Sequence, residues 1–275
     1  MLEQIVSRAP VFLLVVFRCF TTMMTLPLLS SRTVPRMAKI ALALYMAYFI
    51  FPTVSLSDAG SVYADYRSYI KDDGAFNLEY VFLLLGEGMI GIILGFYIQI
   101  IFSAFSTAGQ FFAFQMGLSA SEVYDSLSQV ENPLMGQFFN FLAMIVFLQN
   151  HWFQTLFCEG LYTSFRTLNA FSIVNNTDFF ARFMMTSLSM LFKDALIIAL
   201  PIMGSLFLIN VTMGIFTKAT PQMNLLSEGF PILMLVSFFL IAVLVPQFCE
   251  FFQMSIREGF MEIQSVFTKL SGGIK

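Results

Sequence analysis

Charged residues are scarce in this sequence. They make up 11% of its 275 residues, against about 25% in ordinary globular chains. Hydrophobic residues make up 58%, and 35 Phe and 18 Met are among them. So few charges could not cover the surface of a water-soluble protein of this length. The sequence therefore predicts an integral membrane protein or an obligate membrane-associated assembly, and it contains no basic patch that would indicate nucleic-acid binding.

Metal ligands and catalytic groups are also scarce. His151 is the only histidine, and the three cysteines Cys19, Cys158 and Cys249 are far apart in apolar surroundings. They have no metal-ligand spacing, so we interpret them as small buried hydrophobic residues. We predict no cofactor, no metal site, no catalytic residues and no enzymatic activity. The apolar run at 11–17 stops at Arg18 with no cleavage pattern, so a cleavable signal peptide is not expected.

Six apolar segments stand out, at roughly 10–30, 38–53, 79–105, 138–160, 183–211 and 230–254. A straight membrane span needs about 20 apolar residues, and only the third, fourth and sixth segments meet this comfortably. Prolines that disfavour a straight helix lie in and between the segments: Pro27, Pro35, Pro201, Pro221, Pro231 and Pro246. The sequence therefore predicts an all-α membrane-associated protein, a single domain over 1–275, whose helical segments are partly kinked or broken and form hairpins.

Glycines recur in the third segment. Gly86, Gly88, Gly91 and Gly95 are two to four residues apart, and the last two form a GxxxG pattern. Small residues at this spacing allow a neighbouring helix to approach closely. The alternative is that these glycines have no specific partner.

Two polar connections separate the apolar segments. In the connection at 55–77, Tyr63, Tyr66 and Tyr69 recur every three residues, which predicts a short interfacial helix or, equally, a solvated loop. The second connection covers 166–182, and its polar residues at 175–178 could cap the following helix.

The distribution of cations does not fit a bundle of straight spans. If the six segments alternate across a membrane, the cations in and beside the first connection, Arg18, Arg32, Arg36 and Lys39, place that connection on the cytoplasmic side. That side then has fewer Lys and Arg residues than the opposite side, whereas a conventional topology has more. Either the number of segments is wrong or the chain is not a conventional bundle, and the internal prolines favour the second explanation.

Glu87, Lys193 and Asp194 lie deep inside apolar segments. A charge at the middle of a bilayer costs on the order of 3 kcal/mol, so such groups face a partner subunit, a cavity or one another. We predict that they lie at subunit contacts. A pairing of Glu87 with Lys193 stays open, and the functional alternative is a proton or ion relay.

The stretch from Ser106 to Gln137 has no Lys or Arg and contains three glycines. It is too apolar for a solvated linker and too interrupted for a plain span. Flexible Met and Phe side chains with glycine hinges could close a passage, although Phe and Met at helical spacing also occur as plain packing. The candidate residues are Gly109, Gln110, Phe111, Phe112, Phe114, Gln115, Met116, Gly117 and Leu118.

The order of several short motifs resembles the flagellar biosynthetic protein FliR family, which includes the SpaR and SctT relatives of virulence secretion systems. Near the C-terminus the motifs are Leu200–Pro201, Asn210, Gly214, Pro221–Gln222–Met223–Asn224 and Gly229–Phe230–Pro231. Near the N-terminus they are Arg18, Pro27, Pro35, Arg36 and Pro52. The middle contributes GQFFAFQMGLSAS, then Gln137–Phe138 and FLQNHW. The resemblance spans roughly 5–260.

The resemblance implies a non-enzymatic subunit of a type III protein export gate. In that family the R subunit joins P- and Q-type subunits (FliP and FliQ) in a helical ring in the bacterial inner membrane, at the flagellar basal body. FlhA- and FlhB-type subunits are nearby, and unfolded flagellar proteins pass through. It also implies a P-subunit-like part at roughly 1–180, a Q-subunit-like part at roughly 181–275 and a loop at 109–121 that acts as a pore plug.

The same resemblance marks Pro221, Gln222, Met223, Asn224, Gly229 and Pro231 as signature residues. We interpret Pro221–Asn224 as a structural turn, because proline ends a helix and Gln222 and Asn224 can bond freed backbone groups. No Lys follows Phe230–Pro231 closely, which favours the flagellar over the virulence branch. A small-solute transporter is a further alternative, although no matching pair of interrupted helices is visible in two halves.

Overall fold

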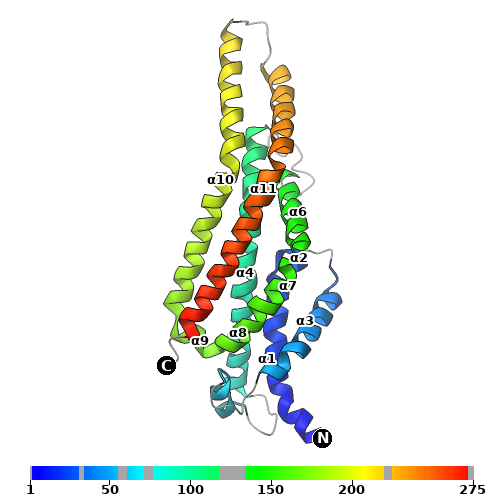
Figure 1. Cartoon of the computed structure of the whole chain (residues 1–275), viewed down its shortest axis with the longest axis vertical. Coiled ribbons are helices and arrows are strands. Elements are labelled where there is room, and N and C mark those ends of the chain that lie inside the picture. The colour runs from blue at the N-terminus through cyan, green and yellow to red at the C-terminus, as the bar shows by residue number, and fades with distance from the viewer. Residues whose placement is uncertain are drawn as a thin grey trace. The chain divides into compact units, whose positions relative to one another are not determined.

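The computed structural model describes residues 2–30, 34–54, 61–70, 77–117, 134–219 and 225–271, and within these ranges it contains helices and no strand (Figure 1). The longer helices are α1 (Leu2–Thr25), α3 (Arg36–Ile50), α4 (Leu78–Gln115), α6 (Leu134–Gln149), α10 (Thr177–Ala219) and α11 (Leu225–Ser271). The shorter ones are α2 (Pro27–Ser30), α7 (Trp152–Thr155), α8 (Tyr162–Thr167) and α9 (Ala170–Asn175). The predicted all-α fold is confirmed.

Four helices in the described part of the chain are long and apolar enough to cross a membrane: α1, α4, α10 and α11. The segments Leu134–Gln149 and Trp152–Thr167 form a fifth candidate span if they are counted as one broken span. The chain bends by 73° between these two segments. The bend lies at His151, whose φ of 57° is left-handed. Beyond the bend, the π-helix η3 (Leu156–Leu161) connects α7 to α8. This break falls in the fourth apolar segment, which contains no proline and was predicted to be long enough for a straight span, so it was not predicted.

The prolines do not all break the helices that contain them. Pro27 follows the end of α1 as predicted, but Pro201 lies inside α10, and Pro231 and Pro246 lie inside α11. The prolines at these three positions therefore do not end their helices. Each proline removes one backbone hydrogen bond, and a long apolar helix keeps its remaining bonds internal because an apolar environment offers no other partners.

The chain forms two compact units. Unit 1 comprises residues 1–99, 151–186 and 256–275, and unit 2 comprises 100–150 and 187–255. Helices α4, α10 and α11 each continue from one unit into the other. The predicted division into a P-subunit-like and a Q-subunit-like part refers to a resemblance to other proteins. It stays a prediction.

The glycines of α4 mark a close helix contact in unit 1. A Cβ atom added at Gly91 would collide with the side chain of Thr21, and one at Gly95 with the side chain of Thr25. The hydroxyls of both threonines donate to carbonyls of their own helix α1, so the threonines present compact surfaces to α4. The predicted close approach is confirmed, and the partner of the glycine row is α1.

The polar connection before α4 contains the 3₁₀ helix η2 (Ala64–Ser68). A 3₁₀ helix has three residues per turn, so side chains three positions apart lie on the same face. The three-residue spacing of the tyrosines therefore has a structural cause. Tyr63 and Tyr66 are buried with their rings 5.1 Å apart, edge to face. The predicted short helix is confirmed over Ala64–Ser68.

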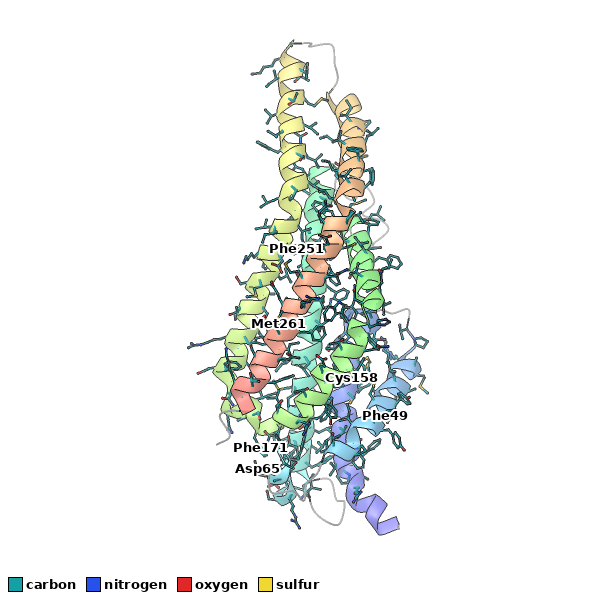
Figure 2. All side chains as sticks on the ribbon, in the orientation of Figure 1. Phe49, Asp65, Cys158, Phe171, Phe251 and Met261 are labelled. Carbon is teal, nitrogen blue, oxygen red and sulfur yellow. The ribbon has the colours of Figure 1, made fainter. Side chains whose placement is uncertain are left out.

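Aromatic rings fill the core of unit 2. Phe102 and Phe105 of α4 both pack edge to face against Phe252 of α11, at 5.2 and 4.8 Å. Figure 2 shows the neighbouring Phe251, whose ring lies 6.2 Å from that of Phe105. These contacts hold α4 and α11 together next to the segment that the sequence marks as a candidate site.

Candidate functional site

A buried ion pair lies in unit 1. The Nε of Arg18 on α1 donates to Oε2 of Glu87 on α4 at 2.6 Å, and neither side chain is exposed. The remaining guanidinium nitrogens donate to the Ser164 hydroxyl at 3.3 Å and to the Leu168 carbonyl at 3.0 Å. The Arg18 guanidinium also lies 4.3 Å above the ring of Phe165. One arginine thus joins α1, α4 and α8 inside an apolar core.

The phenol of Tyr66 completes the coordination of the carboxylate. Its hydroxyl donates to Oε1 of Glu87 at 2.6 Å and accepts from the Ala170 N–H at 2.5 Å. Burial and the adjacent Glu87 carboxylate raise the pKa of the Tyr66 phenol well above its usual range. Tyr66 therefore keeps its proton and remains a donor. Both carboxylate oxygens of Glu87 are bound, an arrangement typical of a fixed structural centre.

Asn169 secures the other side of this centre. Its side chain accepts from the Ser172 N–H at 2.8 Å and so caps α9, and its amide donates to the Val62 carbonyl at 2.8 Å. The connection that contains η2 is thereby fixed to the helix bundle at two points, Asn169 and Tyr66. We name the set formed by Arg18, Tyr66, Glu87, Ser164 and Asn169 the Arg18 network.

The three charges predicted inside apolar segments have different surroundings. Glu87 is enclosed by unit 1, and the partner that the structure gives it is Arg18 rather than Lys193. Lys193 on α10 is exposed, and Asp194 is half-buried. The role of the three at subunit contacts stays a prediction. Sequence reasoning missed Arg18 by assigning it to a connection, although a lone cation and a lone carboxylate in two apolar segments are a signal for such a pair.

The candidate plug segment begins as a helix. Helix α4 continues from the third apolar segment to Gln115, so the expectation of a loop starting near Gly109 was wrong. The apolar residues that follow Ser106 continue the buried face, with Phe112 and Met116 buried, and this packing extends the helix. Phe114 points the other way and is 74% exposed. Gln110 is also exposed, and Phe111 and Gln115 are half-buried.

The two predicted hinge glycines differ. Gly117 has a φ of 78°, which glycine adopts without strain, and it follows the last turn of α4 as a helix-ending glycine does. Gly109 lies inside the helix, so its prediction as a hinge was wrong. Its surface is occupied by a second helix: a Cβ atom there would lie 2.6 Å from the Met135 carbonyl oxygen and 2.7 Å from the Gly136 Cα. Leu118 and the rest of the segment to 121 lie outside the described residues.

A repeated tetrapeptide makes this helix contact. The sequence GQFF occurs at 109–112 in α4 and again at 136–139 in α6. The two glycines are in contact, and the rings of Phe112 and Phe139 lie 4.9 Å apart. Sequence reasoning missed this repeat, because only its first copy was examined as a candidate site. A comparison of residues 109–112 with residues 136–139 would have found it.

The signature residues near the C-terminus fall partly outside the described part of the chain, since Pro221, Gln222, Met223 and Asn224 are not described. Gly229 and Pro231 lie inside α11, which begins at Leu225. Gly229 is buried and Pro231 is exposed. These two residues therefore form no turn, and the interpretation of Pro221–Asn224 as a turn stays a prediction.

Residues 9–259 match the family described as bacterial export proteins, family 1. This chain belongs to that family. The matched range contains the Arg18 network and both GQFF tetrapeptides, so both features lie in the part of the chain shared with the bacterial export proteins.

The chain is similar along almost its whole length to flagellar members of the family. It is 28% identical over 271 residues to the flagellar biosynthetic protein FliR of Escherichia coli. That alignment covers 98% of this chain and 97% of the Escherichia coli protein. It is 29% identical over 244 residues to FliR of Bacillus subtilis, which covers 88% of each. The surface presentation of antigens protein SpaR of Shigella sonnei is 29% identical over 173 residues, which covers 62% of this chain and 66% of that protein.

Proposed function

We propose that this protein is a channel-forming subunit of the flagellar type III protein export gate in the bacterial inner membrane. It assembles with FliP- and FliQ-type subunits, next to FlhA- and FlhB-type subunits, and unfolded flagellar proteins pass through the assembly. Membership of the bacterial export protein family supports this function, as does the near-complete alignment with two FliR proteins. The shorter alignment with SpaR makes the equivalent virulence subunit the second candidate.

The apolar surface of α10 carries the proposal of a hetero-oligomer. Within unit 2 its exposed large apolar residues run from Leu188 to Phe216, which at about 1.5 Å per residue is roughly 42 Å. The hydrocarbon core of a bilayer is about 30 Å thick, and the average helix tilt of about 20° shortens the run only to roughly 39 Å. A run longer than the hydrocarbon core is thick supports the proposal that other protein subunits cover part of this surface.

Lys193 supports the same conclusion. It lies on α10 beside exposed apolar residues such as Phe192 and Leu196, and it is itself exposed. A cation in such a surface is stable when a partner supplies a carboxylate or when it reaches water. A contact with a partner subunit satisfies Lys193 together with the apolar residues that surround it.

The end of α4 supports a role in sealing the passage. After the buried Phe112 and Met116, the helix ends at a glycine and the chain enters the Leu118–Ser121 part of the predicted plug. The exposed ring of Phe114 is available to contact a passing chain or a neighbouring subunit. The described part of the segment contains no charge, which suits a dewetted constriction that blocks ions.

Co-purification tests the assignment. A tagged chain extracted in mild detergent should bring FliP- and FliQ-type subunits with it, whereas a chain purified without both would contradict the proposed assembly. The plug is tested separately by deleting residues 109–118 and measuring membrane potential in cells that contain the assembled complex. We expect ion leakage with secretion partly preserved, and a membrane potential equal to that of the wild type would contradict the plug.

A small-solute transporter is less well supported. Both oxygens of Glu87 are bound by Arg18 and Tyr66, so the buried carboxylate is not open to a solute or an ion. In the part of the chain that the structure describes, no group of His, Cys, Asp or Glu could hold a metal ion. Solute-flux assays on the purified complex separate the two functions.

A further inference from the structure

We propose that one face of α10 is the docking face for a single apolar helix of a different subunit, and that this helix carries a carboxylate opposite Lys193. The face lies in unit 2, and we name it the outer stripe. It consists of eight exposed residues: Lys193, Ile197, Leu200, Gly204, Phe207, Val211, Gly214 and Lys218. The proposal rests on the proposed function and deepens it, because it states which surface of the chain meets a partner and what kind of partner fits.

The outer stripe is the side of α10 that points away from the core of unit 2. Ala195, Ile198 and Ile202 are among the buried residues of α10. Each of them lies two positions before a residue of the outer stripe. Positions two apart on an α-helix point about 160° away from each other. The outer stripe is therefore opposite the side on which α10 packs against its own chain.

The spacing of the outer stripe indicates what can lie along it. Its residues are separated alternately by four and three positions, which is the 3.5-residue repeat of a seam between two helices. Lys193 and Lys218 are 25 positions apart, or about 38 Å along the helix axis. A second helix that crosses α10 at about 20° stays in contact with such a stripe over several turns. A partner helix of similar length therefore fits this face.

The two glycines of the outer stripe are not required by the packing of the described chain. A Cβ atom added at Gly204 or Gly214 would meet nothing within 4 Å, whereas one added at Gly91 or Gly109 would collide with a neighbouring helix. Glycine in a helix interior is less stable than alanine. Small residues at helix interfaces leave space for the close approach of another helix. Lipid chains are fluid and adapt to any side chain, so the two gaps favour a helix with fixed side chains over lipid.

The charges of the outer stripe disfavour a second copy of this chain as the occupant. In a parallel pair of α10 helices Lys193 would face Lys193, and in an antiparallel pair it would face Lys218. Like charges repel strongly in an apolar environment. Asp194, the next residue, points about 100° away around the helix and so lies off the stripe. A carboxylate on a different helix satisfies Lys193 without this repulsion.

Leucine substitutions at the two glycines test the proposal. A Cβ at either position meets no atom of the described chain within 4 Å, so Gly204→Leu and Gly214→Leu fill the gaps and leave the fold of the chain intact. Each should reduce the recovery of partner subunits with the tagged chain several-fold, while the amount of tagged chain in the membrane is unchanged. Thr212→Leu is the control, since Thr212 is exposed on the same helix but lies off the stripe. The proposal is overturned if both leucine variants recover the partner subunits as fully as the control does.

The recovery with the wild-type chain separates this inference from the proposed function. If the wild-type chain brings no FliP- and FliQ-type subunits, the proposed function itself is wrong. If the wild-type chain brings both and the two leucine variants do so equally well, the proposed function stands and the outer stripe is not the docking face.

A photo-cross-link identifies the occupant without depending on the leucine variants. Phe207 is 60% exposed near the middle of the outer stripe, so p-benzoylphenylalanine at this position replaces one aromatic side chain with another. Irradiation of the assembled complex should join the chain to a different subunit, which mass spectrometry of the product identifies. Lys193→Glu should lower the yield of this product several-fold and Lys193→Arg should preserve it, because the partner supplies a carboxylate. A product that contains two copies of this chain, or a phospholipid adduct with no protein adduct, would overturn the proposal.

Discussion

Arg18 and Glu87 are separated by 69 positions in the sequence, yet the arginine Nε and the carboxylate Oε2 are 2.6 Å apart and fully buried. Burying two charges is costly, and it is tolerated only when hydrogen bonds satisfy the remaining atoms. Here Tyr66 binds the second carboxylate oxygen, and Ser164 and the Leu168 carbonyl bind the guanidinium. The pair therefore specifies which faces of α1 and α4 meet.

Removal of one charge should destabilise the protein strongly. Glu87→Ala leaves the Arg18 guanidinium uncompensated, and breaking a buried pair in this way costs about 3–5 kcal/mol. Arg18→Met with Glu87→Met should cost less than the sum of the two single changes, because neither charge is then left alone. Thermal unfolding of the purified complex measures this, with Arg166→Ala, an exposed arginine of the same unit, as the control. Additive effects would show that the two residues do not interact.

Tyr66 should matter through its hydroxyl alone. Tyr66→Phe keeps the ring but removes the donor to Glu87 and the acceptor for the Ala170 N–H, and an unmatched buried polar group costs about 1–3 kcal/mol. Tyr69→Phe is the matched control, since Tyr69 is half-buried on the same 3₁₀ turn and its ring packs on Phe171. We expect a lower unfolding temperature for the first variant and little change for the second. Equal unfolding temperatures would contradict the role of the Tyr66 hydroxyl.

The same hydroxyl predicts a pH dependence. The pKa of Tyr66 is raised in the folded state, whereas the pKa of an unfolded tyrosine is about 10. Below pH 10 both states carry the proton and the stability is unaffected, and above it the unfolded state loses the proton first, so stability falls by about 1.4 kcal/mol per pH unit for this group. The slope above pH 10 should be shallower in Tyr66→Phe. An unchanged slope would place the titration elsewhere.

The contacts differ in how readily the sequence predicts them. The spacing of Gly91 and Gly95 predicted a close helix neighbour, and the three-residue spacing of Tyr63 and Tyr66 predicted a short helix, because local periodicity dictates which side chains share a face. The pairing of Arg18 with Glu87 was not predictable in this way. Which of several lone charges meet depends on how distant helices pack, and nothing local to either residue encodes it.

Gly109, near the end of α4, is a second feature that the sequence alone did not predict correctly. Gly109 was predicted to be a hinge because glycine is conformationally free, but glycine also lacks a side chain, and at this position the lack of volume is what the structure uses. A single glycine in a sequence does not distinguish the two uses. The structure does distinguish them, since a Cβ atom at Gly109 would meet the backbone of Met135 and Gly136.

The glycine row of α4 provides a prediction about unit 1. Gly91→Ala places a Cβ against the Thr21 side chain and the Arg18 carbonyl, so α1 must shift, and overpacking of this kind costs about 1–3 kcal/mol. The shift would also lengthen the bond from Arg18 to Glu87. Gly204→Ala meets nothing and gains helix propensity, so it should be neutral or slightly stabilising. Unfolding temperatures of the two variants should therefore change in opposite directions or differ clearly, and equal values would contradict the close contact.

Substitutions of Phe112 and Phe114 distinguish a role in packing the helices from a role in sealing the passage. The Phe112 ring is buried against Phe139 and Phe248, so Phe112→Ala should cost about 3–5 kcal/mol of stability. Phe114 is largely exposed in this chain, so Phe114→Ala should leave stability unchanged while it alters ion leak or secretion rate, if its ring faces the passage or a partner subunit. Unfolding temperature and membrane potential, measured on both variants, distinguish the two roles. A stable, non-leaking Phe114→Ala variant with normal secretion would restrict the sealing function to residues beyond the end of α4.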